Sequence, residues 1–106
     1  MKERSRTPQT RKAARERIAR LFGLAGGEFA EHPELSNRYV EIARKIAMRQ
    51  RVRIEKPMSR QYCRRCSSFL VPGQSSRVRV RDGYVVVTCI ACKSRRRYPL
   101  KGRRKA

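Results

Sequence analysis

Apolar residues near the start of the chain recur at spacings of three and four, the repeat of an amphipathic α-helix. The series follows Thr7-Pro8, where a threonine N-cap and a proline at the first helical position favour a helix start. Gly26-Gly27 is expected to end this helix. The apolar positions are Ala14, Ile18, Leu21, Phe22 and Ala25.

A second helical repeat follows His32-Pro33 and continues to about Arg51, before Pro57. Its large apolar residues are spaced four, three and four apart, and smaller ones widen the same face. These residues are Leu35, Tyr39, Ile42 and Ile46, with Val40, Ala43 and Ala47 beside them. Two amphipathic helices joined by a short glycine-containing connection predict an antiparallel helical hairpin.

From residue 60 the helical repeat gives way to alternation with a period of two, which is typical of β-strands. Residues 77–81 and 84–88 flank Asp82-Gly83, a two-residue turn signal that sets the register of a hairpin. The pattern allows a third strand over residues 95–100, which Pro99 would restrict to an edge. One face of the hairpin is expected to pack inward; it carries Val78, Val80, Val85 and Val87.

Four cysteines form two C-x-x-C pairs, Cys63/Cys66 and Cys89/Cys92, with 22 residues between them. Two such knuckles at the ends of a hairpin place four sulfurs at the corners of a tetrahedron, the closed geometry of structural zinc. One structural Zn²⁺ is therefore predicted. Disulfides, an iron–sulfur cluster and a redox-active pair are the alternatives. His32, the one histidine, lies at a helix start and is not expected to be a ligand.

Together these elements predict a small α+β protein. Its expected parts are a basic N-terminal tail (1–7), an antiparallel two-helix hairpin (8–56), a zinc ribbon of two to three antiparallel strands (57–100) and a basic C-terminal tail (101–106). Two helices alone leave much of their apolar faces uncovered, so either the ribbon or another protein must cover them.

The 106 residues include 29 lysines and arginines against 8 aspartates and glutamates, a formal net charge of +21. This excess predicts a polyanionic partner, nucleic acid before an anionic membrane surface. The longest unbroken apolar run has four residues, so no membrane span is expected, and the N-terminus lacks the apolar segment of a secretory signal. A cytoplasmic location follows. One histidine and scattered carboxylates also offer little for hydrolytic catalysis.

Arginines beside and within the predicted strands are the candidates for nucleic-acid binding. Three of them alternate along one strand face at intervals of about 7 Å, which suits a row of phosphates. A tyrosine at the end of that face is placed to stack on an unpaired base. The candidates on the ribbon are Arg77, Arg79, Arg81, Tyr84, Arg95, Arg96 and Arg97, all expected on one basic surface, and those before it are Arg49, Arg51 and Arg53.

Three segments resemble a known protein family, archaeal ribonuclease P protein component 4, the zinc-ribbon subunit shared with the eukaryotic enzyme. They are residues 43–49 (ARKIAMR), 62–66 (YCRRC) and 69–73 (FLVPG), which precede the second C-x-x-C pair. The resemblance covers roughly residues 8–100. Ser67 and Lys93 depart from the glycine that many zinc knuckles carry directly after the second cysteine.

The resemblance implies a non-catalytic RNA-binding subunit. In ribonuclease P the RNA holds the magnesium ions and removes the 5′ leader of precursor tRNA. The subunit is implied to pair through its helices with a barrel-shaped protein subunit, and the pair to bind the specificity domain of the RNA, so that precursor tRNA is a partner only indirectly. The implied zinc ligands are Cys63, Cys66, Cys89 and Cys92. The candidates for core and partner interface together are Ile18, Leu21, Phe22, Leu35, Tyr39, Ile42 and Ile46.

Three other hypotheses compete with this one. A zinc-ribbon ribosomal protein has the same size, charge and metal, although the two-helix prefix argues against it. A transcription-associated zinc ribbon usually carries further domains. An independent nuclease would need carboxylates clustered for magnesium or a histidine pair for acid–base work, and the sequence has neither.

Overall fold

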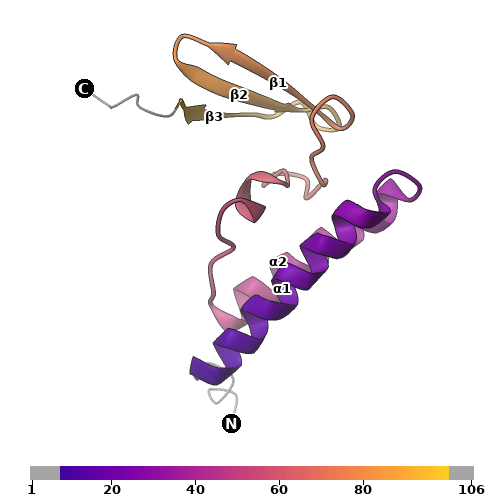
Figure 1. Ribbon diagram of the computed structural model, residues 1–106, viewed down its shortest axis with the longest axis vertical. Coiled ribbons are helices and arrows are strands. Elements are labelled where there is room, and N and C mark those ends of the chain that lie inside the picture. The colour runs from indigo at the N-terminus through magenta and orange to yellow at the C-terminus, as the bar shows by residue number, and fades with distance from the viewer. Residues whose placement is uncertain (1–7, 101–106) are drawn as a thin grey trace.

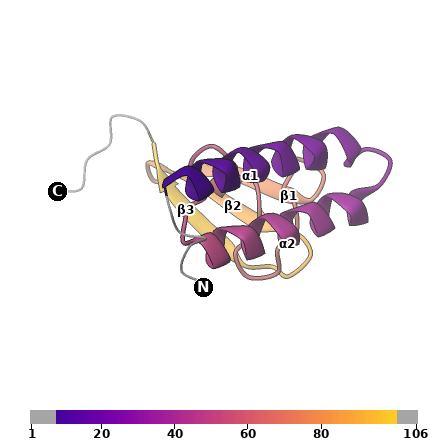
Figure 2. The same cartoon turned by 90° about the horizontal axis from the view of Figure 1, so that it is seen from below.

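Two long helices lie side by side and antiparallel in the computed structural model, which describes residues 8–100 (Figure 1). α1 spans Pro8–Glu28 and α2 spans Pro33–Gln50. The view from below shows the two helices alongside each other for most of their length (Figure 2). The predicted helical hairpin is confirmed. The proposed N-cap Thr7 and the two basic tails lie outside the described residues.

The first helix is longer than predicted, because Gly26-Gly27 does not end it. Each glycine costs a helix about 1 kcal/mol relative to alanine. Tertiary contacts offset this cost. Phe29, the residue directly after α1, packs against Phe69, with ring centroids 6.0 Å apart. Packing at the end of the helix therefore overrides the local preference of the two glycines.

The buried faces of the two helices are rich in small side chains. Short side chains allow helix backbones to approach closely, and the Ser36 hydroxyl of α2 donates a hydrogen bond to the Ala25 carbonyl of α1. This bond joins the helices and satisfies a hydroxyl that is fully buried. The buried residues are Ala14, Ile18, Phe22 and Ala25 on α1, and Ser36, Val40, Ala43 and Ala47 on α2.

The larger apolar residues of α2 lie beside this buried row and not within it. Leu35, Tyr39 and Ile46 are half-buried, and Ile42 is 38% exposed. At about 100° per residue, these four lie roughly 100° around the helix from the buried row. The predicted centre of the buried face is therefore wrong, because the close contact with α1 selects small residues over large ones.

Three antiparallel strands form one sheet in the order β1-β2-β3, as Figure 1 shows. β1 spans Ser76–Arg81, β2 spans Tyr84–Cys89 and β3 spans Arg95–Pro99. The predicted β1–β2 register is confirmed pair by pair. Both turn residues, Asp82 and Gly83, have the positive φ that a two-residue hairpin turn requires, 51° and 81°. The third strand is present and lies at an edge.

The hydrophobic core lies between the helices and residues 52–71, which lead from α2 into the sheet. Ile54, Tyr62 and Phe69 are the buried members of this segment, and the Tyr62 ring centroid lies 5.8 Å from that of Phe22. A single 3-10 turn, η2 (Met58–Arg60), interrupts the segment. Among the described residues, no strand residue belongs to the core cluster. One core cluster therefore continues across residue 57, the predicted start of the ribbon.

The valine face of the sheet is packed inward only in part. Val78 is 43% exposed and Val80 is 66% exposed, whereas Val85 and Val87 are half-buried. Residues 52–71 pack between the helices and the sheet, so the helices do not reach this sheet face. The loop around residues 60–72 lies beside it instead. The two enclose an open groove of about 370 Å³, to which Val78 and Val87 contribute.

Candidate metal centre and nucleic-acid interface

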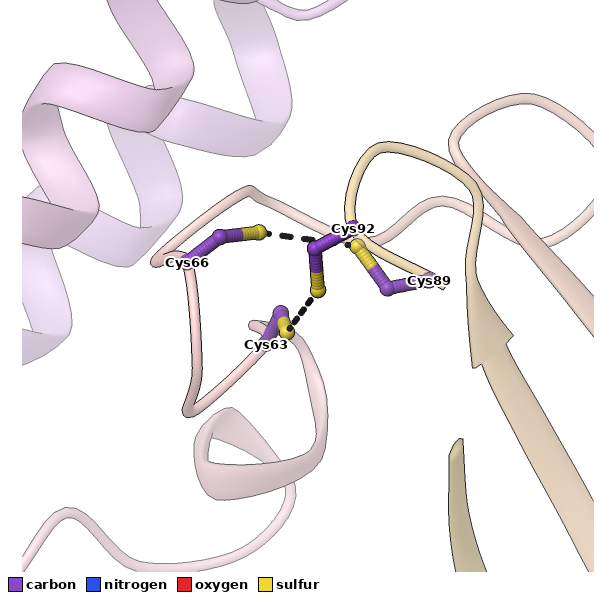
Figure 3. A group of neighbouring side chains, drawn as sticks. All are labelled: Cys63, Cys66, Cys89 and Cys92. Atoms are coloured by element: carbon purple, nitrogen blue, oxygen red, sulfur yellow. Dashed lines mark hydrogen bonds between the residues drawn. The ribbon is translucent and has the colours of Figure 1, made fainter. Parts of the chain in front are cut away.

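The four cysteine sulfurs converge on one point between the two knuckles (Figure 3). All four Sγ atoms lie within 4.8 Å of one another. The Sγ atoms of Cys63 and Cys92 are 3.5 Å apart, and those of Cys66 and Cys89 are 3.6 Å apart. Each close pair joins one knuckle to the other, so the cluster ties the start of the ribbon to the end of β2. The predicted ligands are therefore brought together in a set that can hold one metal ion.

The two knuckles repeat the same backbone hydrogen bonds. The N–H of Ser67 donates to the Cys63 carbonyl (2.7 Å), as the N–H of Lys93 does to the Cys89 carbonyl (2.8 Å). Ser67 and Lys93 adopt positive φ, 66° and 69°, at the position where the sequence departs from glycine. A side chain costs roughly 1–2 kcal/mol in this left-handed region. Closing the turn around the sulfurs thus imposes backbone strain at both knuckles.

Two serines, each two residues beyond a knuckle, contact the sulfurs. The Ser94 hydroxyl lies 3.2 Å from the sulfurs of both Cys63 and Cys92, and the Ser68 hydroxyl lies 3.1 Å from that of Cys66. Hydrogen bonds to thiolate sulfurs stabilise their negative charge. Sequence reasoning missed these serines, although the spacing C-x-x-C-x-S occurs in both knuckles.

The thiols differ in how readily they ionise. Burial by itself raises the pKa of Cys63, but hydrogen bonds from the Ser94 hydroxyl and from the backbone outweigh burial and lower this pKa to about 6. Burial raises the pKa of Cys89 to about 12, although backbone N–H groups oppose the shift. The Ser94 hydroxyl and backbone N–H lower the pKa of Cys92. Cys63 therefore ionises more readily than Cys89, and a bound cation would favour loss of the proton from Cys89.

Two polar residues of α2 attach the first knuckle to the helices. The Asn37 side-chain oxygen accepts a 2.8 Å hydrogen bond from the Phe69 N–H. The Arg44 guanidinium donates to the Ser67 hydroxyl at 2.8 Å and lies over the Tyr62 ring, 5.1 Å from its centroid. These contacts orient the cysteine cluster on the helical hairpin. Helical periodicity gave no signal for either residue, because both lie off the apolar face.

Most of the arginines predicted to bind RNA share one face of the sheet. They line an open groove of about 940 Å³ together with Lys93, and Asp82 at the hairpin turn is the one carboxylate there. Among residues 8–100, no ion pair joins a groove cation to a carboxylate. Tyr84 lies at the end of the groove, with the Arg97 guanidinium 5.7 Å from its ring centroid. The predicted residues found here are Arg77, Arg79, Arg81, Tyr84, Arg95 and Arg97.

Arg96 lies on the opposite face, so its expected place on the same basic surface is wrong. It pairs with Val87 across the strands, and the alternation of β3 turns it away from Arg95 and Arg97. The Arg96 guanidinium lies 5.8 Å from the ring centroid of Tyr98. The Arg60 guanidinium lies over the same ring, 4.0 Å from its centroid. Sequence reasoning missed this stacked group, which ties the β3 edge to η2.

The remaining predicted residues lie away from the sheet. Arg49, Arg51 and Arg53 are exposed at the C-terminal end of α2, which Figure 1 shows at the opposite end of the molecule from the sheet. Ile18 and Phe22 are 1% and 4% exposed, so their side chains serve the core of this chain and are not available to a partner.

Sequence and structure comparisons identify relatives across most of the chain. The family described as "RNAse P Rpr2/Rpp21/SNM1 subunit domain" matches residues 17–93. The chain belongs to this ribonuclease P subunit family. It is 54% identical over 100 residues to ribonuclease P protein component 4 of Methanoculleus marisnigri, covering 94% of this chain and 95% of the relative. It is 45% identical over 101 residues to the protein of that name from Thermococcus kodakarensis, covering 92% and 76%.

Two solved structures are similar to this family member in both fold and sequence. One is a chain in the cryo-EM structure of archaeal ribonuclease P with mature tRNA, with a TM-score of 0.79, 38% identity, and coverage of 85% of this chain and 78% of that one. The other is Pfu Rpp21, with a TM-score of 0.60, 43% identity, and coverage of 81% and 99%. The resemblance seen in the sequence is thus confirmed. No helix within residues 8–100 has the length and apolar character needed to cross a membrane.

The strained knuckle positions yield a stability prediction. Lys93→Gly should raise the free energy of unfolding by roughly 0.5–1 kcal/mol, because relief of the left-handed strain exceeds the added freedom of the unfolded chain. Ser67→Gly should gain less, since it also removes the hydrogen bond from Arg44. Guanidinium unfolding of the metal-loaded chain, followed by circular dichroism, measures both. Lys45→Gly, at an exposed position of α2, is the control and should lower the free energy of unfolding. A lower free energy of unfolding in Lys93→Gly would contradict the strain argument.

Proposed function

We propose that this chain is a non-catalytic, RNA-binding protein subunit of ribonuclease P that supports RNA-catalysed removal of the 5′ leader of precursor tRNA. The structural match to a chain of archaeal ribonuclease P, over 85% of this chain, is the observation that carries the proposal. The family assignment supports it over a ribosomal or transcription-associated zinc ribbon. We place the protein in the cytoplasm with its RNA.

The chain supplies charge and shape for this enzyme, and the RNA supplies the chemistry. Among residues 8–100, the cysteine set is the one group of three or more side chains arranged to hold a metal ion. Four sulfur ligands complete a tetrahedral shell, which leaves no position for a catalytic water. Hydrolysis by this chain would need a carboxylate or histidine site in addition.

The metal that fits the cysteine set is one structural Zn²⁺. A tetrahedral site with zinc–sulfur bonds of about 2.3 Å has its sulfurs about 3.8 Å apart. The two closest sulfur–sulfur distances in the cluster, 3.5 and 3.6 Å, are near that spacing. The ligands are Cys63, Cys66, Cys89 and Cys92, and the ion would fasten the second knuckle to the first.

Removal of one ligand tests the metal assignment. Cys89→Ser should abolish stoichiometric zinc and unfold the ribbon while the helical signal persists, because binding of structural zinc contributes on the order of 10 kcal/mol to folding. Elemental analysis of reduced protein and far-ultraviolet circular dichroism measure the two effects. His32→Ala is the control, since His32 is exposed at the start of α2. Iron in the purified chain, or full zinc content in Cys89→Ser, would contradict the assignment.

The protein partner would dock on the outer flank of the helical hairpin, a surface made by Leu21, Leu24, Leu35, Tyr39, Ile42 and Ile46. Leu24 is 44% exposed and Ile42 is 38% exposed. On α2, Asn37 and Arg44 lie on the other side of the buried row and contact the first knuckle. Gly26 of α1 faces the knuckle in the same way, with Phe69 4.0 Å from where its Cβ would be.

The outer flank therefore points away from the ribbon on both helices, and nothing among residues 8–100 covers it fully. A half-buried apolar surface of this kind is typical of an interface. We assign it to the barrel-shaped protein subunit of the enzyme, with which the chain would bind the specificity domain of the RNA.

A charge placed on the outer flank tests this interface. Ile42→Asp should weaken association with the partner subunit by at least about tenfold, because it buries a carboxylate in an apolar contact. Isothermal titration calorimetry measures the affinity. Val80→Asp adds the same charge at an exposed apolar position of the sheet and should leave the affinity unchanged. Equal losses in the two variants would contradict the assigned surface.

Removal of the β1 arginines tests RNA binding and separates this chain from an enzyme. The variant replaces Arg77, Arg79 and Arg81 together by alanine, and it should bind RNA more weakly. The slope of log affinity against log salt should fall by about 0.7 to 0.9 for each phosphate that is no longer neutralised. Zinc content should not change. At saturating magnesium the cleavage step should slow little, since the RNA performs it. Cleavage of precursor tRNA by the purified protein without RNA would overturn the proposed function.

A further inference from the structure

Two rows of arginines flank the central strand on one face of the sheet. The first row lies on β1, and the second lies on β3, although the strands are separated by β2. Across the sheet, Arg79 pairs with Val86 and Val86 with Arg97, so these side chains share a face. Two residues further along the strands the arrangement repeats: Thr88 of β2 pairs with Arg77 on one side and with Arg95 on the other. The floor between the arginines is therefore uncharged.

The dimensions of this groove follow from the geometry of the sheet. Two strand spacings of about 4.8 Å separate the arginine rows by about 10 Å, and residues two apart on a strand are about 7 Å apart. The groove ends at Tyr84 near the hairpin turn and at Lys93 beside the second knuckle. It is a trough with cations along both walls and an uncharged floor of Val86, Thr88 and Tyr84.

We propose that this groove binds one unpaired strand of RNA, laid along β2 with its phosphates between the two arginine rows. The proposal rests on the proposed function and specifies the form of RNA that this site takes. Positively charged grooves with an aromatic floor bind single strands because the walls track the backbone while the floor accepts base faces. The groove cations form no ion pair with a carboxylate among residues 8–100, so phosphates have no internal counter-ion to displace.

A duplex fits this groove less well than a single strand. A double helix is wider than the gap of about 10 Å between the arginine rows, so it would rest on the arginine tips and leave the floor uncovered. It also keeps its bases stacked inside the helix, where Val86, Thr88 and Tyr84 cannot reach their faces. The walls and the floor act together only on an unpaired strand.

Binding of a short labelled RNA to the full-length, zinc-loaded chain tests the proposal. The probe is an unpaired RNA of about eight nucleotides, a typical site size for such grooves, compared with the same sequence annealed to its complement. Fluorescence anisotropy over a series of salt concentrations measures both affinities. The single strand should bind about tenfold more tightly than the duplex.

Two variants that add the same charge on opposite faces isolate the groove. Val86→Glu places a carboxylate on the floor between Arg79 and Arg97 and should weaken single-strand binding by at least about tenfold. Val80→Glu adds that charge on the opposite face, at a residue 66% exposed, and should change the affinity by less than about twofold. Zinc content and circular dichroism establish that each variant is folded.

A second pair of variants removes one charge and does not depend on burying a carboxylate. Arg97→Ala should weaken binding by about tenfold and reduce the single-strand salt slope by about 0.7. Arg20→Ala, on the exposed surface of α1, removes the same charge away from the groove and should have an effect below about twofold.

The outcomes separate this proposal from the proposed function. Equal losses in Val86→Glu and Val80→Glu, or in Arg97→Ala and Arg20→Ala, would overturn the groove as the site, because net charge alone would then explain binding. Equal or tighter binding of the duplex would overturn the single-strand assignment. In either case the chain would still bind ribonuclease P RNA. Failure of the unaltered chain to bind that RNA would overturn the proposed function as well.

Discussion

The first knuckle belongs to two structures at once, and the position of the sheet depends on it. Its cysteines enter the sulfur cluster, while Tyr62 and Phe69 at its two ends enter the helical core. No strand of the described chain contributes to that core, so the sheet has little apolar contact with the helices. A metal ion at the cluster would join the second knuckle to the first and, through it, the sheet to the helical hairpin.

This arrangement explains how a chain with so few large apolar residues forms an ordered ribbon. A hydrophobic core of this size stabilises a small domain only marginally, and metal binding commonly provides the rest. Polar contacts add direction to the link: Asn37 and Arg44 bind the first knuckle, and Arg60 lies over Tyr98 at the far edge of the sheet. The sheet is thus held in one orientation without being buried.

The sheet lies outside the hydrophobic core, and its two faces differ in charge. The face with arginines on β1 and β3 forms the basic groove, and the valine face forms the smaller groove beside residues 60–72. The outer flank of the helices points away from the ribbon. The proposed RNA site and the proposed protein interface are therefore separate surfaces.

The sequence by itself determined the features that depend on local chemistry. Helical periodicity, the Asp82-Gly83 turn and the two C-x-x-C pairs each act over a few residues, so both helices, the hairpin register and the cluster of four cysteines could be predicted. Only the tertiary structure decided which residues are covered. It extended α1 past Gly26-Gly27, placed small residues between the helices and left the valine face open, because burial depends on which segment packs where. It also brought Arg95 and Arg97 into line with the β1 arginines and turned Arg96 away, since the face of a third strand follows from its pairing with β2.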